Sequence, residues 1–406
     1  MKYTEGGVTA AKGFRAYGIH AGVKAGREKE DLALIACDLP CNAAGLFTRN
    51  RVKASPVLLD IETLRNGQAQ AIIANSGIAN ACAPNGMKHA EEMQTIAAEA
   101  LGISNDLVLV SSTGVIGQEL FTECMKEHIG DLTAKLTDTP EGSDLAEKAI
   151  MTTDTVKKEF AVEFEISGKP VRLGGIAKGS GMIHPNMGTM LAYLTTDCAI
   201  SVPMLKKALK AACDVSFNRI SVDGDTSTND SLIILASGLA ENEMIAAEGE
   251  DYDQFLAALT DLCVNLARAM AKDGEGAKHL ITCTVRNAES EAKAEVLAKS
   301  VIRSPLTKAA IFGCDANCGR VMCALGYAGE NFDPDRTDIR FVSKAGSIEV
   351  VKDGLGLVFD EDLAERILRE DEVLIDVDLK EGGSEVTCWG CDLTYDYVKI
   401  NGDYRT

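Results

Sequence analysis

The sequence predicts an α/β (α+β) fold in which layered sheets are flanked by helices, and three observations support this class. Apolar runs at residues 32–37 and 71–74 have the length and continuous hydrophobicity of buried strands. Residues 88–101 instead carry Ala, Met, Ile and Leu at helical spacing, with Glu between them. The 406 residues are 46% hydrophobic and 25% charged, which is enough apolar material for two or three core-bearing units.

The remaining elements follow from the same patterns in chain order. Strands are expected over residues 107–110, 159–166, 171–173, 192–196 and 232–236, and an alternating pattern predicts a last strand within 385–400. Helices are expected over residues 118–135, 145–150, 203–215 and 250–272. No Pro-, Gly- or Ser-rich linker marks a domain boundary.

The charge of the chain argues against a polyanionic partner. The formal net charge is -20 at pH 7 and the pI is about 4.8, so nucleic acid and anionic lipid surfaces would be repelled. Residues 1–7 lack the apolar segment of a signal peptide, and no apolar run approaches the ~20 residues that span a bilayer. We therefore expect a cytoplasmic protein that acts on small molecules, with neither nucleic acid nor a membrane as partner.

The thirteen cysteines and five histidines do not predict a metal site. Cys388 and Cys391 have the spacing of zinc ligands, but they lie in the alternating run, where residues three apart point to opposite faces of a strand. Asp223 and Asp225 suggest a calcium loop, but the twelfth position, which requires Glu, is Ile234. An odd number of cysteines in a chain of this size indicates reduced thiols rather than a disulfide framework.

The most unusual stretch is residues 174–191, which contain five glycines and one proline. Gly is costly to order and Pro lacks a backbone donor, so this composition predicts an irregular, closely packed loop that leads into the strand 192–196. Near the end of the loop, Gly188 precedes Thr189. A Thr hydroxyl in this position can attack the preceding carbonyl, shift the acyl group from N to O and release a new N-terminus, whose amine then serves as its base.

Two other functions, phosphate binding and dinucleotide binding, are excluded because the loop lacks a residue that each of them requires. Gly174 and Gly179 have the first spacing of a phosphate-binding loop, but Ser180 stands where Lys is required. A dinucleotide-binding loop would need glycine at His184. A simpler alternative stays open, which is that Thr189 only begins a strand, because β-branched residues fit a pleated surface.

Residues 178–183, 185–187 and 189–191 together resemble the self-cleavage segment of the ornithine acetyltransferase family, the bifunctional proteins of arginine biosynthesis. The resemblance extends over nearly the whole chain. Two positions depart from the family pattern, because Gly188 stands where Ala is usual and Cys318 stands where Trp is usual. Glycine leaves the preceding carbonyl accessible, so self-cleavage remains the expectation.

The resemblance implies a layered sandwich like that of ornithine acetyltransferases and related aminopeptidases. It implies cleavage into an N-terminal chain, residues 1–188, and a C-terminal chain, residues 189–406, which stay associated and form a dimer of heterodimers. The implied reaction is acetyl transfer from N-acetylornithine to glutamate through an acetyl-Thr189 intermediate. No bound cofactor is implied, and acetyl-CoA is a further candidate acetyl donor.

Thr113 and Gly114 are the expected oxyanion hole. A strand that opens into Thr-Gly offers a hydroxyl and a backbone N–H side by side, although a plain turn after the strand has the same pattern. The resemblance to the ornithine acetyltransferase family implies that Thr113 and Gly114 stabilise the oxyanion and that Thr189 is the nucleophile.

The resemblance also assigns the substrate contacts, which are Thr152, Lys178, Thr189, Glu275, Asn401 and Thr406. Within the run 152–155, Thr153 and Thr155 are alternatives to Thr152. Glu275 lies in an Asp-Gly-Glu-Gly run, which on pattern alone would be a helix end with a solvated acid. Asn401 and Thr406 lie at the C-terminus, where chain ends normally fray.

Two alternative functions remain open. In the first, a self-processing aminopeptidase or amidase, water takes the acyl group and glutamate is not required. In the second, a non-catalytic binding protein, the glycine-rich loop only packs and the polypeptide stays intact.

Overall fold

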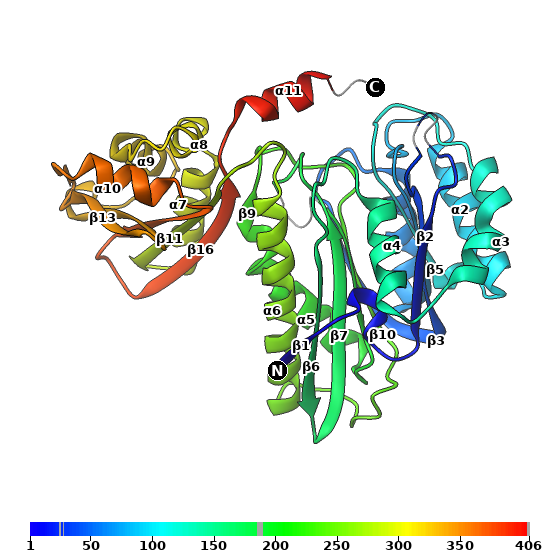
Figure 1. The fold of residues 1–406 in the computed structure, drawn as a ribbon. Coiled ribbons are helices and arrows are strands. Elements are labelled where there is room, and N and C mark those ends of the chain that lie inside the picture. The colour runs from blue at the N-terminus through cyan, green and yellow to red at the C-terminus, as the bar shows by residue number, and fades with distance from the viewer. Residues whose placement is uncertain (24–25, 27, 185–189, 404–406) are drawn as a thin grey trace.

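The computed structural model describes residues 1–23, 26, 28–184 and 190–403, which form two sheets flanked by helices (Figure 1). This arrangement confirms the predicted fold class. A larger unit contains a nine-stranded sheet, and a smaller unit towards the C-terminus contains a seven-stranded sheet. Among the described residues, no helix combines the length and apolar character needed to cross a bilayer.

The nine-stranded sheet has the order β1-β6-β7-β8-β10-β3-β4-β5, with β2 paired to β3. Its strands are β1 Lys2–Thr4, β2 Phe14–Ile19, β3 Leu32–Phe47, β4 Gln68–Asn75, β5 Val108–Ser112, β6 Glu159–Ile166, β7 Lys169–Lys178, β8 Leu191–Thr196 and β10 Ser231–Ala236. The pairing of β7 with β8 is antiparallel, whereas β8 with β10 and β4 with β5 are parallel.

The long strand β3 lets this sheet fold over on itself. Its first half pairs with β2 and β4, its register shifts between Ala36 and Cys41, and its second half pairs with β10. Ile72 and Leu109 from one half of the sheet share a core with Tyr193 and Ile233 from the other half. The two halves therefore face each other, and their central strands are buried on both sides, which explains their continuously apolar sequences.

Helices cover the two outer faces of this folded sheet. They are α1 Ser55–Thr63, α2 Gly86–Leu101, α3 Glu123–Lys135, α5 Val202–Asp214 and α6 Glu250–Lys272, whereas α4 Pro140–Ile150 contributes Ala146, Ala149 and Ile150 to the core between the two halves. On one face, α5 and α6 pack against the half that contains β6, β7, β8 and β10. On the other, α2 and α3 pack against β4 and β5, with Ala90, Met93 and Ala97 of α2 on one helical stripe.

The smaller unit is built on the sheet β14-β13-β12-β15-β11-β16-β9. Its strands are β9 Ile220–Ser221, β11 Leu280–Ala288, β12 Asp338–Ser343, β13 Gly346–Lys352, β14 Leu355–Gly356, β15 Glu372–Asp378 and β16 Ser384–Cys391. The helices α7 Glu291–Arg303, α8 Pro305–Phe312, α9 Cys318–Gly326 and α10 Glu361–Leu368 accompany this sheet. Cys388 lies in the core of this unit whereas Cys391 lies in the α5–α6 core, so the two thiols lie on opposite faces of β16.

The last helix, α11 Tyr395–Asp403, leaves the smaller unit and extends over the top of the larger one (Figure 1). The predicted alternation over 385–400 is therefore wrong beyond Cys391. Thr394 ends the extended segment, because its hydroxyl accepts a hydrogen bond from the Tyr397 N–H at 3.3 Å and donates one to the Gly276 carbonyl at 2.8 Å. This helix brings the C-terminal part of the chain back to the larger unit.

Two other expectations need correction. The glycine-rich segment is not irregular from its start, because β7 continues through Gly174 and Gly175 to Lys178. A side chain at Gly174 would lie 1.8 Å from the Gly7 carbonyl oxygen, so glycine here permits close approach of two backbones within regular structure. The helix expected over 118–135 begins only at Glu123.

Candidate active site

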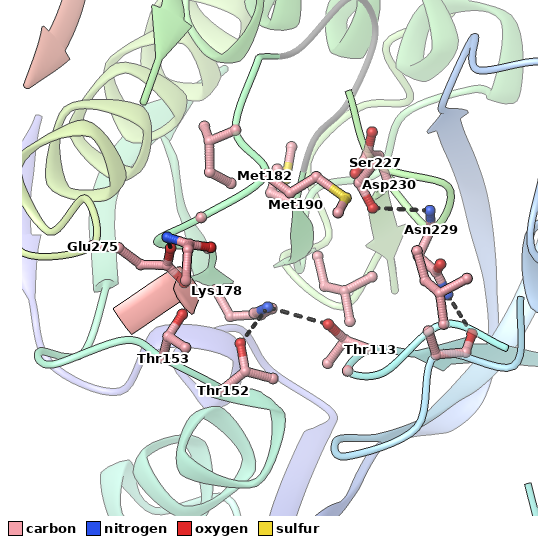
Figure 2. Close-up of a pocket in the computed structure, with 18 residues that line it drawn as sticks. Thr113, Thr152, Thr153, Lys178, Met182, Met190, Ser227, Asn229, Asp230 and Glu275 are labelled. Carbon is pink, nitrogen blue, oxygen red and sulfur yellow. Dashed lines mark hydrogen bonds between the residues drawn. The ribbon is translucent and has the colours of Figure 1, made fainter. Parts of the chain in front are cut away.

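A cavity of about 150 Å³ lies where several elements of the larger unit meet α11 (Figure 2). It is lined from the end of β5, the segment between α4 and β6, the end of β7, the start of β8, the loop before β10 and the loop after α6. Six of the predicted site residues line it, namely Thr113, Gly114, Thr152, Lys178, Glu275 and Asn401. Residues more than 280 positions apart in the sequence therefore share one cavity.

Lys178, the last residue of β7, is at the centre of the polar contacts. Its Nζ donates to Thr113 Oγ1 at 3.1 Å and to Thr152 Oγ1 at 2.9 Å (Figure 2). Because both hydroxyls accept from Lys178, each can direct its own proton to another acceptor. Burial lowers the pKa of Lys178 below its ordinary value, and the nearby Asp154 carboxylate opposes this shift.

Thr113 and Gly114 present two donors side by side. The Thr113 N–H is fixed by the Asn75 carbonyl at 3.0 Å, and the Gly114 N–H has no partner among the described residues. Gly114 has a φ of 129°, and a Cβ there would lie 2.3 Å from the Gly77 carbonyl carbon. Only glycine therefore fits this turn, and both Gly114 and Thr113 line the cavity.

Glu275 is held by groups from two other segments. Its carboxylate accepts from Asn401 Nδ2 of α11 at 2.7 Å, and its N–H donates to the Ser180 carbonyl at 2.9 Å. A Cβ at Gly181 would lie 2.4 Å from the Glu275 carboxylate, so the glycine leaves room for this acid. Glu275 is only 8% exposed, which makes it a buried carboxylate at the cavity wall rather than a solvated helix end.

The polar loop before β10 lines the cavity and also holds neighbouring backbone segments in place. Asn229 Nδ2 donates to the carbonyls of Ala79 at 2.6 Å and Ser112 at 2.8 Å, so it ties this loop to the end of β5. Asp223 accepts from the N–H groups of Met182 and Ile183 at 2.6 Å and 2.9 Å. Asp223, one of the two residues that suggested a calcium loop, therefore holds a backbone segment of the cavity wall.

The sequence analysis assigned no role to Asp230, which lies within residues 223–234, the segment weighed as a calcium loop. Asp230 lines the cavity, is 1% exposed, and its Oδ2 has no hydrogen-bond partner among the described residues. Burial raises the pKa of this carboxyl well above its ordinary value, and the charge of Lys178 opposes the shift. A buried acid with one oxygen free of hydrogen bonds, close enough to a lysine to feel its charge, is a frequent feature of functional sites.

The threonines of residues 152–155 do not all face the cavity. Thr152 and Thr153 both line the cavity, whereas Thr155 donates to Asp273 instead. Lys158, just beyond this run, is 0% exposed and was not singled out, because a buried lysine has no distinguishing signal in a single sequence.

Gly188, Thr189 and Thr406 lie outside the described residues. Met190 and Leu191, which follow Thr189 in the chain, do line the cavity. The catalytic and substrate-binding roles of all the assigned residues remain predictions at this stage.

Comparisons with known proteins relate this chain to one family. The sequence model of the ArgJ family matches residues 15–406. The arginine biosynthesis bifunctional protein ArgJ of Symbiobacterium thermophilum is 50% identical over 408 aligned residues, and that of Caldanaerobacter subterraneus subsp. tengcongensis is 48% identical over 407, with 100% of both chains covered in each case. A crystal structure of arginine biosynthesis bifunctional protein argJ from Bacillus halodurans is 44% identical with a TM-score of 0.50, and the match covers 52% of this chain and 98% of that chain.

Proposed function

Because this chain belongs to the ArgJ family, we propose that it is an acyltransferase of arginine biosynthesis that transfers the acetyl group of N-acetylornithine to glutamate through an acetyl-Thr189 intermediate. The observation that carries the proposal is the single cavity shared by Thr113, Gly114, Thr152, Lys178, Glu275 and Asn401, with Met190 and Leu191 in its wall. A nucleophile at position 189 is joined directly to this wall.

The first step is self-cleavage. The Thr189 hydroxyl attacks the Gly188 carbonyl, the acyl group moves from the Thr189 nitrogen to its oxygen, and water hydrolyses the resulting ester. The products are a carboxylate at Gly188 and a free α-amino group at Thr189. This amine then accepts the proton of the Thr189 hydroxyl in each turnover.

Acetyl transfer then follows in two half-reactions. The Thr189 oxygen attacks the acetyl carbonyl of N-acetylornithine, and the Thr113 hydroxyl and the Gly114 N–H stabilise the oxyanion that forms. The C–N bond breaks, ornithine takes a proton and leaves, and the acetyl group stays on Thr189. The amino group of glutamate then attacks this ester, which gives N-acetylglutamate and regenerates the threonine hydroxyl.

Charge in the cavity suits this substrate pair. The Glu275 carboxylate is a partner for an ammonium group of ornithine, and Asn401 holds it in place. The Lys178 ammonium lowers the pKa of an amine nearby by like-charge repulsion, which favours the neutral Thr189 α-amino group that the mechanism needs. Thr152 and Thr406 complete the proposed substrate contacts.

The proposed cut gives chains of residues 1–188 and 189–406, of which the second is slightly more than half of the 406 residues. The solved Bacillus halodurans chain supports this division, because 98% of that chain matches only 52% of this one. We extend the proposal to a dimer of such two-chain units in the cytoplasm, with no bound cofactor and with acetyl-CoA as a second acetyl donor.

The test combines mass spectrometry with kinetics. Purified wild-type protein should contain two chains that meet at Gly188 and Thr189, and Thr189→Ala should give one uncut chain. Incubation with N-acetylornithine alone should add one acetyl group to the C-terminal chain and release ornithine, and the full reaction should follow ping-pong kinetics. Uncut wild-type protein with full transfer activity would refute the mechanism, and release of free acetate without a requirement for glutamate would favour the amidase instead.

A further inference from the structure

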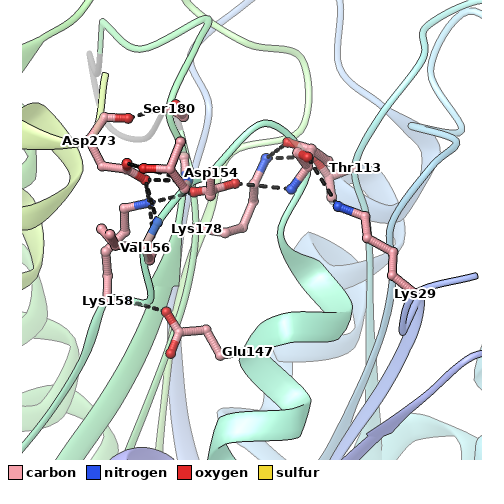
Figure 3. Close-up of polar contacts among 12 residues, drawn as sticks. Lys29, Thr113, Glu147, Asp154, Val156, Lys158, Lys178, Ser180 and Asp273 are labelled. Carbon is pink, nitrogen blue, oxygen red and sulfur yellow. Dashed lines mark hydrogen bonds and ion pairs between the residues drawn. The ribbon is translucent and has the colours of Figure 1, made fainter. Parts of the chain in front are cut away.

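A buried group of charges centres on Lys158 and extends through Asp154 towards Lys178, a residue of the cavity wall (Figure 3). The Lys158 side chain is 0% exposed, and its Nζ lies 2.6 Å from Asp154 Oδ1 and 2.6 Å from Asp273 Oδ2. The Asp154 and Asp273 side chains are 0% and 5% exposed. Together with Lys178, the group contains two cations and two carboxylates.

Asp154 connects this group to two substrate contacts. Its Oδ2 accepts from the Thr152 N–H at 3.0 Å, and its Oδ1 accepts from the Gly179 N–H at 2.7 Å, next to Lys178 in the chain. Burial acts to raise the pKa of Asp154, but the charges of Lys178 and Lys158 outweigh it and the pKa lies below its ordinary value. Asp154 is therefore a fixed anion. Its hydrogen bonds hold the backbone at Thr152 and at Gly179, the residue after Lys178.

Asp273 connects the same lysine to the third substrate contact. Its carboxylate accepts from the Thr155 N–H at 3.0 Å and from the Thr155 hydroxyl. Its backbone carbonyl accepts from Ser180 Oγ at 2.6 Å, and the Ser180 carbonyl accepts from the Glu275 N–H at 2.9 Å. Glu275 is thus fixed relative to Lys158 through two residues only.

We propose that Asp154, Lys158 and Asp273 are positioning residues that hold Thr152, Lys178 and Glu275 at the spacing that the acetylated amine requires. This inference rests on the proposed function. Asp154 and Lys158 precede the proposed cut and Asp273 follows it, so the ion pair between Lys158 and Asp273 also joins the two chains.

Stability alone is a poor explanation for such a group. A buried ion pair loses most of its Coulomb energy to desolvation, and apolar residues of the same volume often stabilise a fold as well or better. Here Asp154 also accepts the N–H groups of Thr152 and Gly179, which both line the cavity, and Asp273 accepts the N–H of Thr155, three residues beyond Thr152. What the charges add is a fixed geometry between three separate segments of the chain.

A double-mutant cycle between Asp273→Asn and Glu275→Gln separates positioning from stability. Asparagine keeps the volume of Asp273 and an acceptor for the Thr155 N–H, but it loses the ion pair with Lys158. We expect Asp273→Asn to lower kcat/KM for N-acetylornithine about tenfold, mainly through KM, because a binding group displaced by a fraction of an ångström loses much of its effect. In the Glu275→Gln background, Asp273→Asn should have almost no further effect, because coupled residues are not additive.

Lys293→Met is the matched control. The Lys293 side chain is 8% exposed and its Nζ lies 2.5 Å from Glu381 Oε2 in the smaller unit, so the change breaks a comparably buried ion pair away from the cavity. It should lower the thermal stability and leave kcat/KM unchanged. Rates are expressed per cleaved molecule, counted by mass spectrometry.

The outcomes are distinct. Wild-type protein without transfer activity would overturn the proposed function and this inference with it. If the wild type is active but the effects of Asp273→Asn and Glu275→Gln on kcat/KM multiply in the double variant, the positioning role alone is overturned. If Asp273→Asn is not recovered folded, Ser180→Ala replaces it in the same cycle, because it removes only the hydroxyl that donates to the Asp273 carbonyl, and additive effects would refute the inference equally.

Discussion

Replacing Gly181 with alanine should impair substrate binding without unfolding the protein. The new Cβ would lie 2.4 Å from the Glu275 carboxylate carbon, whereas ordinary contact begins at 3.4 Å, so the carboxylate must retreat by about 1 Å. Gly181 has no positive φ, and the atoms it meets are the end of a flexible side chain, so the stability should change by less than about 1 kcal/mol. A 1 Å misplacement of a binding group lowers kcat/KM by about 10²-fold, which is the effect we expect for N-acetylornithine.

The assay measures initial rates against N-acetylornithine concentration, alongside thermal unfolding of the same preparations. Gly383→Ala is the control, because a Cβ there meets nothing within 4 Å. In a Glu275→Ala background, Gly181→Ala should cause no further loss. The reasoning is wrong if Gly181→Ala keeps kcat/KM within about twofold of wild type, or if its full effect persists when Glu275 is absent.

Three further predictions concern the oxyanion hole, the base and Glu147, a buried acid of α4 (Figure 3). Thr113→Ala should lower kcat about 10²-fold with KM nearly unchanged, and should also slow self-cleavage; a change confined to KM in steady-state kinetics would assign Thr113 to substrate binding. The acidic limb of the pH dependence of kcat/KM should lie at or below the ordinary α-amino pKa of about 7.7 to 8.0, and Lys178→Met should move it to higher pH, because removal of a cation raises the pKa of the amine; an unmoved limb contradicts the proposed base. Burial raises the pKa of Glu147 from 4.5 to about 8, so the folded protein keeps a proton that the unfolded chain loses and its stability falls as pH rises between these values, by up to about 1.4 kcal/mol per pH unit. Glu147→Gln, compared with Glu147 in the uncleaved Thr189→Ala background by urea unfolding at several pH values, should flatten this decline, and parallel curves would contradict the assignment.

The sequence predicted best the elements whose surroundings are uniform. The continuously apolar strands 71–74 and 107–110 were recognised because both of their faces are buried, and α6 was predicted over Glu250–Lys272 because its apolar stripe is long and regular. Gly174 and Gly175 were wrongly predicted to lie in an irregular loop. They lie in a strand, where glycine is needed because a Cβ would meet the Gly7 carbonyl in one case and the Leu194 side chain in the other. Contacts between segments so far apart leave no mark in a local pattern.

The site residues were assigned through motif resemblance rather than through physical pattern, and the structure shows only that six of them line one cavity. On pattern alone, Glu275 was a solvated acid and Asn401 lay on a frayed end, and only the return of α11 over the larger unit brings the two within 2.7 Å. Asp154 and Asp273 stood within runs that had been singled out, but their partner Lys158 could not be recognised. Lysine is almost always exposed, and its burial here depends on carboxylates supplied by two distant segments.

If the proposed cleavage occurs, the pairing of β7 with β8 determines how the protein responds to heating. The two strands are hydrogen-bonded neighbours from Leu173 and Thr196 to Lys178 and Leu191, and the proposed cut before Thr189 would sever the segment that joins them along the chain. Before cleavage this short tether holds the strands at an effective concentration of about millimolar, so they pair readily during folding. After cleavage and unfolding, two separate chains must meet by diffusion, each with an unpaired strand edge that favours aggregation. The working lifetime of the cleaved enzyme would then be set by its rate of unfolding rather than by a reversible equilibrium.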